Sequence, residues 1–403
     1  MERSILDQII TTQKAEEIAR LNAIEIIESL FGALNERERN ILSRRFGLHG
    51  FSRETLENIG QVHNLTRERI RQIESSGVKK LRQLENLNEY IKGLRKVINQ
   101  LLEEHGGLME KGYLLNSLVK FSVEGITSRS ESNEDVHKSH LEFLISKLLH
   151  DDFEEITSSK YFKESFKFKY QELDHLEELA EELLSEIKNR KTILKTKEII
   201  ELINNLNARQ KYSEKLNIPN NVDISGVLKK EFFTEDSDLI NANKVAYALL
   251  QAHKKIDQNK FGDWGIDEWR EIKPKTINDK IYLILKNHGK PMHFIEIAEK
   301  INKSGFDNKK ANPATVHNEL ILDKKYILVG RGLYSLREWG FKNGTVADVI
   351  VEILNNAGQP LTRDEIMAKV LEQRLVKKAT IVLALMDKSK FEKIGDKYAV
   401  KQV

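Results

Sequence analysis

The feature that most constrains the fold of this chain is an internal repeat near its C-terminal end. Residues 276–301 align without a gap on residues 345–370. The residues that recur include Thr276, Asp279, Leu285, Gly289, Pro291, Glu296, Ile297 and Lys300, which return as Thr345, Asp348, Leu354, Gly358, Pro360, Glu365, Ile366 and Lys369. After a shorter loop, Ala314, Thr315 and Leu320 return as Ala379, Thr380 and Leu385. A repeat of this kind predicts two copies of one small domain.

Each copy has the order of elements of a winged helix. A helix, a Gly-x-Pro turn and a second helix are followed by a third helix, which opens at Thr315 or Thr380. In the first copy two short apolar runs are separated by Gly330 and Arg331, and this pattern predicts a two-stranded wing. In the second copy the wing sequence differs and reads EKIGDKYAV. We therefore expect winged-helix domains at residues 274–340 and 344–403.

The first copy also resembles a known family. Its GKPMHFIEIAEKI stretch at residues 289–301 and its GRGLYSL wing at residues 330–336 are similar to the HARE-HTH winged helices. These occur in the delta subunit of bacterial RNA polymerase, in restriction systems and in chromatin proteins. If the copy binds DNA, the expected contacts are Lys309, Lys310 and Arg331, beside a third helix that opens with Thr315, His317 and Asn318. The alternative is a protein-interaction domain on which these are ordinary surface residues.

A helix-turn-helix is predicted nearer the N-terminus. The stretches TLENIG at residues 55–60 and TRERIRQIE at residues 66–74 form two helices joined by residues 63–65. Thr66 is a good N-cap, and Glu68 suits the positive end of the helix dipole. At about 100° per residue one face of the second helix is polar and the other packs. The polar face holds Arg67, Glu68, Arg71 and Gln72. The packing face holds Ile70, Ile73, Gly77 and Leu81.

The polar face has the chemistry needed to read base edges in the major groove. Arg pairs with guanine, Glu accepts from cytosine and Gln pairs with adenine, each worth roughly 1–3 kcal/mol of discrimination. Farther along the same helix Lys79, Lys80 and Arg82 are expected to meet phosphates. The simpler alternative is a charged helix that only faces solvent.

The segment around this motif resembles region 4 of primary-type bacterial sigma factors. Asn35 and Glu38 fit a capping box for a preceding helix that ends near Gly47. The resemblance covers residues 34–84 and implies binding to the promoter -35 element and to the flap of RNA polymerase. It places Arg67, Glu68, Arg71 and Gln72 at the base contacts, and Thr55, Leu56 and Lys79 beside the DNA backbone. Gly77 departs from the family and costs about 1 kcal/mol against Ala, so we expect a looser helix end.

The part of a sigma factor that melts the -10 element is not recognised in this sequence. Residues 1–33 precede the motif and hold one aromatic residue, Phe31. They have the pattern of an amphipathic helix, which either covers the region 4-like core or binds a partner or a second copy. We therefore expect a protein that does not open a promoter alone and works with core polymerase or with another sigma factor.

The middle of the chain carries weaker signals. Three helices are predicted, at residues 94–102, 113–121 and 140–149, and residues 153–168 alternate as paired strands do. This is the order of elements in a winged helix. We therefore expect a divergent winged helix at residues 91–170, with residues 127–135 as a loop. Residues 171–270 are expected to form an acidic helix and a helical unit, with Trp264 and Trp269 as core or domain-packing residues. The outer face of the acidic helix is either solvated or binds a basic partner.

Composition limits the chemistry of the chain. Cys is absent, which excludes thiolate metal sites and disulfides and suits a reducing cytoplasm. The net charge of +3 is too small to diagnose nucleic-acid binding, but residues 34–84 carry eleven Lys or Arg against six acids. We expect no catalytic residues, metal or cofactor, and no nuclease site. His137 and His140 are predicted surface residues, and no membrane span is predicted.

These signals predict a mainly α fold: a sigma region 4-like helix-turn-helix at residues 34–90, then helical linker domains, then tandem winged helices with small β wings. The predicted function is a DNA-binding, sigma-like initiation protein in the bacterial cytoplasm, associated with the nucleoid. Its expected partners are double-stranded promoter DNA, the flap of core RNA polymerase and another sigma factor. The alternative is a polymerase-associated regulator or scaffold of the delta-subunit kind with non-specific DNA binding. A dimeric repressor is a third hypothesis.

Overall fold

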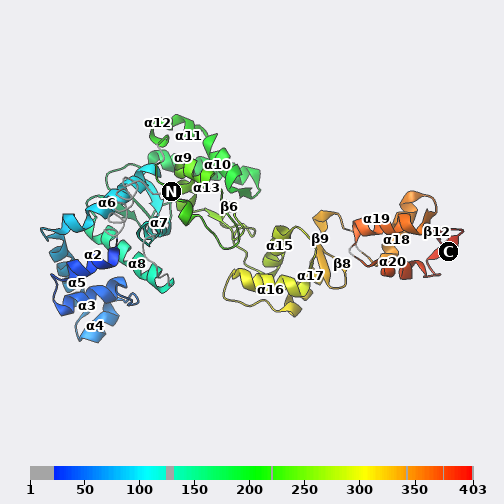
Figure 1. Ribbon diagram of the computed structural model, residues 1–403, viewed down its shortest axis with the longest axis horizontal. Helices are drawn as coiled ribbons and strands as arrows, with labels where there is room; N and C mark the ends of the chain where they lie inside the picture. The colour runs from blue at the N-terminus through cyan, green and yellow to red at the C-terminus, as the bar shows by residue number, and fades with distance from the viewer. Residues whose placement is uncertain (1–21, 124–130, 219–220, 342–343, 375, 402–403) are drawn as a thin grey trace, which may run out of the picture. The chain divides into compact units, whose positions relative to one another are not determined.

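The computed structural model describes residues 22–123, 131–218, 221–341, 344–374 and 376–401 (Figure 1). Most of the predicted N-terminal helix, residues 1–21, lies outside these. The fold is mainly α-helical, as predicted, with small antiparallel sheets. Two compact units divide it: residues 1–258 with 262–267, and residues 259–261 with 268–403.

The first four helices among the described residues of the first unit form a part that we call the head. They are α2 (Ala23–Phe31), α3 (Glu36–Phe46), α4 (Leu56–His63) and α5 (Arg67–Arg82). The capping box predicted for α3 is present, because the Asn35 and Glu38 side chains each bond the other's backbone, and Gly47 ends the helix in the left-handed region. Ile41, Ile59 and Ile70 meet in the core and hold α3, α4 and α5 together.

The next part of the first unit has helices and strands in winged-helix order. Its elements are α6 (Leu87–Glu104), β1 (Leu108–Glu110), α7 (Lys111–Val123), α8 (Glu131–Phe143), the π-helical turn η1 (Leu144–Leu148), β2 (Phe153–Ile156) and β3 (Ser165–Phe168). β3 is the central strand and pairs antiparallel with β1 and β2. Of the loop expected at residues 127–135, residues 127–130 lie outside the described residues, and the rest belongs to α8, which begins at Glu131.

The last part of the first unit was expected to be helical, but it also contains a sheet. Here β4 (Leu194–Lys195), β6 (Asp263–Ile266) and β5 (Ile256–Gln258) pair in that order. These strands are two to four residues long, too short for an alternating pattern to show in the sequence. The helices are α9 (Asp174–Arg190), α10 (Thr196–Asn204), α11 (Asn207–Lys211), α12 (Ser213–Leu216), η2 (Ser225–Val227), α13 (Ser237–Ala242) and α14 (Lys244–Ala252).

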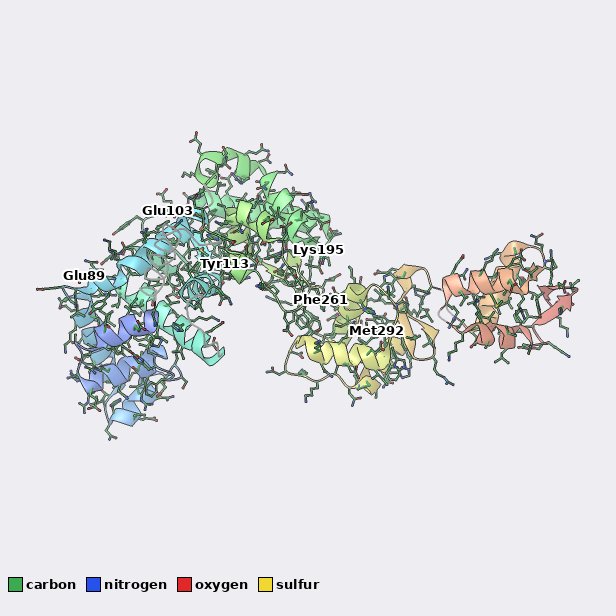
Figure 2. The ribbon with its side chains drawn as sticks, viewed as in Figure 1. Glu89, Glu103, Tyr113, Lys195, Phe261 and Met292 are labelled. Atoms are coloured by element: carbon green, nitrogen blue, oxygen red, sulfur yellow. The ribbon has the colours of Figure 1, made fainter. Side chains whose placement is uncertain are left out.

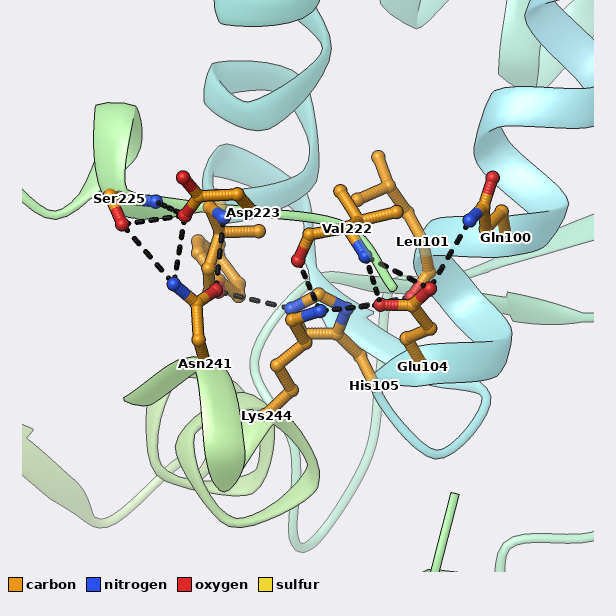
Figure 3. A network of polar contacts seen from close by, with 11 residues as sticks. Gln100, Leu101, Glu104, His105, Val222, Asp223, Ser225, Asn241 and Lys244 are labelled. Carbon is orange, nitrogen blue, oxygen red and sulfur yellow. Dashed lines mark hydrogen bonds and ion pairs between the residues drawn. The ribbon is translucent and has the colours of Figure 1, made fainter. Parts of the chain in front are cut away.

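A buried polar network joins these last two parts of the first unit (Figure 3). Lys244 of α14 donates to the carboxylate of Glu104 of α6 and to the Val222 carbonyl, and its side chain is 0% exposed. The Val222 N–H donates to Glu104 Oε2 at 3.0 Å. Burial alone would raise the pKa of Glu104, but the hydrogen bonds from Lys244 and Val222 hold it below its usual value.

An aromatic chain continues from this network. His105 donates from Nδ1 to the Leu101 carbonyl at 2.6 Å, and its Nε2 then accepts from the Tyr113 hydroxyl at 3.1 Å. Tyr113, labelled on α7 in Figure 2, packs edge-on against Tyr247, which packs against Trp264. Trp264 is buried on β6, which confirms it as a core residue, whereas Trp269 is half-buried.

The second unit holds the two repeats, each with three helices and a three-stranded sheet. The first has α15 (Ile277–His288), β7 (Met292–His293), α16 (Phe294–Ser304), α17 (Pro313–Leu322), β8 (Tyr326–Gly330), β9 (Leu333–Leu336) and the short turn η3 (Arg337–Trp339). The second has α18 (Val346–Ala357), β10 (Leu361–Thr362), α19 (Arg363–Gln373), α20 (Lys378–Leu385), β11 (Phe391–Ile394) and β12 (Lys397–Val400). Both sheets have the strand order found in the first unit, β7-β9-β8 and β10-β12-β11. The wing predicted in each copy is therefore present.

Candidate nucleic-acid interface

The turn between α4 and α5 is set by one glycine and two cap residues. Asn64 ends α4 in the left-handed region, with φ of 54°, and the Thr66 hydroxyl accepts from the Arg69 N–H at 3.2 Å to start α5. A Cβ at Gly60 would lie 2.7 Å from the Leu65 carbonyl oxygen, closer than any side chain allows. Gly60 therefore lets the turn close, and the turn fixes the direction of α5.

The face of α5 opposite the core presents the four predicted base-reading side chains. Arg67, Glu68, Arg71 and Gln72 are all exposed. Arg71 donates from Nε and Nη2 to the two Glu68 carboxylate oxygens at 2.8 and 2.7 Å. This pairing lowers the pKa of Glu68 and raises that of Arg71, so both are charged.

One neighbour on this face was missed in the sequence. Arg69 is exposed, and its Nη1 donates to Gln72 Oε1 at 3.1 Å. The i, i+3 spacing of Arg69 and Gln72 is the signal that predicts such a contact. The face thus holds two pairs, each of an arginine with an acceptor that is itself able to meet a base.

The residues expected at the DNA backbone lie in different surroundings. Lys79 is exposed on α5, and Thr55 is the N-cap of α4, where its hydroxyl accepts from the Asn58 N–H at 3.2 Å. Leu56 is half-buried against the core of the head. Lys80 forms an ion pair with Glu38, and Arg82 donates to the Lys147 carbonyl at 2.7 Å. Lys80 and Arg82 are thus already engaged within the first unit.

Gly77 has a packing reason that the sequence did not reveal. It is buried on α5, and a Cβ there would lie 3.2 Å from Leu42 Cδ1 on α3. α5 continues as a regular helix to Arg82, and the looser helix end expected from this glycine stays a prediction. The glycine allows α3 and α5 to approach each other closely.

The prediction that His137 and His140 are surface residues is wrong. Both are buried on α8, and the His140 ring packs edge-on against His49 of the head at 4.9 Å. Burial lowers the pKa of His140 to about 4. The polar sequence around these histidines predicted exposure, but the head covers this part of α8, a long-range contact.

The residues expected to bind DNA in the first repeat lie at its surface. Lys309 and Lys310 are exposed in the loop before α17, and Arg331 is exposed at the turn between β8 and β9. On α17, Thr315 and Asn318 are also exposed. His317 is half-buried, with its ring between those of Phe294 at 4.6 Å and Tyr334 at 5.8 Å.

Two other kinds of feature are absent from the described residues. They contain no cluster of three or more His, Asp or Glu side chains placed to hold a metal ion. None of their helices is both long enough and apolar enough to cross a membrane.

Comparisons with known proteins cover two parts of the chain. The family model "Sigma-70, region 4" matches residues 30–83. The HARE-HTH model, which describes a helix-turn-helix domain of ASXL proteins and restriction endonucleases, matches residues 275–339. No solved structure matches the chain.

Several matching relatives are named as RNA polymerase sigma factors. SigA1 of Synechococcus elongatus is 44% identical over 80 residues, which are 19% of this chain and 20% of the relative. SigA of Microcystis aeruginosa is 42% identical over 80 residues, 19% of each chain. RpoD of Helicobacter pylori is 58% identical over 57 residues, 14% of this chain and 8% of the relative. The chain thus spans about a fifth or less of the length of these relatives. It contains a sigma-70 region 4 domain at residues 30–83 and a HARE-HTH domain at residues 275–339.

Proposed function

We propose that this protein is a DNA-binding, sigma-like transcription initiation protein that recognises a promoter -35 element and associates with bacterial RNA polymerase. The observation that carries the proposal is the exposed face of α5, with Arg67, Glu68, Arg71 and Gln72 on a region 4 domain. Placed in the major groove, these side chains offer donors to guanine and acceptors to cytosine or adenine. The head meets the polymerase flap in this proposal.

The pairing of Glu68 with Arg71 supports base reading. An arginine whose fork is held by a neighbouring carboxylate loses less freedom on binding, because its direction is already set. Glu68 keeps acceptor capacity for a cytosine amino group while it holds Arg71. The two residues are therefore expected to act together, and removal of one alters the other.

We further propose that strand opening at the -10 element is supplied by another chain. Among the described residues the exposed aromatic side chains are Phe51, Tyr90 and Tyr170; Tyr90 lies on α6, and the other two lie in loops after α3 and after β3. Capture of unpaired bases needs aromatic rings gathered into a stacking platform. We expect transcription from a linear promoter template when a complete sigma factor is added. We expect no transcription when core polymerase and this protein are the only proteins present. Transcript formation in the latter case overturns this part of the proposal.

The test of base reading is fluorescence anisotropy with a labelled -35 duplex and a scrambled duplex, with and without core polymerase. We expect a preference for the -35 duplex that tightens with core. Arg67→Ala should weaken binding to the -35 duplex by about tenfold to a hundredfold and leave the scrambled duplex almost unchanged. The matched control is Lys79→Ala, an exposed phosphate-contact candidate on the same helix, which should weaken both duplexes alike. Equal weakening by Arg67→Ala contradicts base reading.

A second candidate function is supported by the HARE-HTH domain and by exposed Lys309, Lys310 and Arg331. In it the protein is a polymerase-associated regulator or scaffold of the delta-subunit kind, and DNA binding is non-specific. Salt dependence separates the two candidates, because phosphate attraction falls steeply with salt for every sequence alike. Affinity that is equal for both duplexes at every salt concentration favours the second candidate.

A further inference from the structure

The third helix of the second repeat has an apolar stripe on its outer side. α20 packs its inner side into the domain core through buried Ile381 and Leu385. At about 100° per residue, Ala379, Val382, Leu383 and Met386 lie within a single narrow stripe on another side. Leu383 is 68% exposed and Met386 is 66% exposed. A helix that is apolar on its outer side as well as its inner side is typical of one covered by a partner.

The matching helix of the first repeat differs at three of these four positions. The repeat aligns Ala379, Val382, Leu383 and Met386 with Ala314, His317, Asn318 and Ile321 of α17. Two of the four positions therefore carry hydrogen-bonding groups in the first copy and none in the second. Side chains such as Val and Leu offer a base edge contact only with a thymine methyl group. The stripe on α20 is thus unsuited to reading DNA and suited to an apolar surface.

The surroundings of the stripe are basic. Residues 376–401 hold seven lysines and three acids. Lys377 and Lys378 stand exposed at the start of α20, and Lys388, Lys393 and Lys397 are exposed beyond its end and on the wing. The acids Asp387, Glu392 and Asp396 are exposed as well, but lysines outnumber them, and an apolar centre with a rim of mainly one charge recognises a partner of the opposite charge. The same rim disfavours pairing of two copies through the stripe, because it brings the lysines of both copies together.

We propose that α20 and its lysine rim form a docking surface for an acidic amphipathic helix of another protein. The stripe has the i, i+3, i+4, i+7 spacing by which one helix anchors against another, and the lysines meet the acidic flanks of the partner. Leu383 and Met386 are the anchors. In the first repeat Ile321 is also exposed, but Asn318 takes the position of Leu383 and interrupts the stripe.

The sequence provides a reporter for this surface. The chain has five methionines, so labelling their methyl groups with carbon-13 gives five signals from the full-length protein. Met386 lies on the stripe, Met367 is packed against the core of the same domain, and Met292 is buried in the first repeat (Figure 2). The Met367 signal is an internal control for unfolding of the second repeat, and the Met292 signal is a control for binding to the first repeat.

The probe is a designed helical peptide of about five turns with Leu along one stripe and Glu on both flanks. We expect it to shift the Met386 signal alone, and a matched peptide with Lys in place of Glu to bind at least about tenfold more weakly. Leu383→Ser should weaken binding of the Glu peptide by about tenfold, whereas Asn318→Ser, the matched change in the first repeat, should leave it unchanged.

Four outcomes overturn the proposal. They are no movement of the Met386 signal, equal movement with the Lys and Glu peptides, movement with duplex DNA, and movement with protein concentration in the absence of any probe. The third assigns the surface to nucleic acid and the fourth to a second copy of this chain. The test does not depend on -35 recognition, because it needs neither promoter DNA nor polymerase.

Discussion

Two lysine–carboxylate pairs show how differently the two units are held together. In the first unit Lys244 and Glu104 have side chains that are 0% and 4% exposed, and they are 140 residues apart in the sequence. In the second unit Lys280 and Asp307 are 5% and 39% exposed and 27 residues apart. The first pair joins distant parts of the chain away from water, while the second fastens α15 to a nearby loop within one winged helix. We infer that loss of the first pair destabilises a large part of its unit.

The largest expected effect tests that difference directly. Lys244→Met leaves the Glu104 carboxylate buried without its cation, and a broken buried pair costs about 3–5 kcal/mol. Lys280→Met should cost much less, because water reaches Asp307. Urea unfolding of the full-length chain, monitored by tryptophan fluorescence, measures the free energy of unfolding of both variants.

The outcome is sharpened by a second substitution. When Glu104→Gln is added to Lys244→Met, neither position of this pair carries a buried charge. The amide oxygen of the new Gln side chain can still accept from the Val222 N–H. We expect the double variant to regain much of the lost stability. Equal losses for Lys244→Met and Lys280→Met contradict the comparison, and so does a double variant that is less stable than Lys244→Met alone.

Acid should also affect the first unit before the second. Burial lowers the pKa of His105, His140 and His253 in the first unit to about 4 in each case. The pKa of a histidine in an unfolded chain is about 6.5. Between pH 4 and pH 6.5 the unfolded state therefore binds more protons than the folded state. The stabilisation is therefore complete above about pH 6.5 and is lost as the pH falls toward 4, by up to about 1.4 kcal/mol per pH unit for each histidine.

Hydrogen exchange of the full-length protein at pH 7 and pH 5 distinguishes the units. Exchange, corrected for its intrinsic pH dependence, should accelerate in the described residues of the first unit and change little in those of the second. His140→Phe keeps a ring beside His49 and removes the titrating group, so it should make the stability of the first unit less dependent on pH. An unchanged pH dependence in this variant would show that His140 does not contribute.

The sequence predicted best what depends on neighbours along the chain. The α3 capping box, the Thr66 N-cap and the exposed face of α5 follow from residues within one or two turns. The wing of the first copy was predicted from its two apolar runs, and that of the second copy from its repeat of the preceding helices. Of the candidate site, the exposure of the α5 face was predicted, but the pairs that Arg71 and Arg69 form within it were not.

What the sequence did not predict depends on contacts between distant segments. The burial of His140 requires the head to cover α8, and the Lys244–Glu104 pair requires two helices that are 140 residues apart to meet. The sheet of β4, β5 and β6 is built from strands too short to show a period. The sequence indicated exposure for His140 and a helical unit where the sheet lies, and tertiary packing decided otherwise.

The smallest expected effect tests whether close contact inside the first unit extends to its helix-turn-helix. Helix propensity alone predicts that Gly77→Ala stabilises α5 by about 1 kcal/mol. The added Cβ would lie 3.2 Å from Leu42 Cδ1, and Leu42 is fully buried with little room to move. Crowding of this kind costs about 1–3 kcal/mol, so after the propensity gain we expect a net loss of up to about 2 kcal/mol, centred on about 1 kcal/mol.

The matched control for this prediction is Ser76→Ala, the neighbouring position on the same helix, which is exposed. There the better helix propensity of Ala acts without crowding, and a gain of a few tenths of a kcal/mol is expected. Urea unfolding of the two variants therefore gives opposite signs if α3 and α5 are in close contact. If both variants gain stability, then Leu42 yields to the new methyl group, and the head is packed more loosely than the buried network that joins α6 to α14.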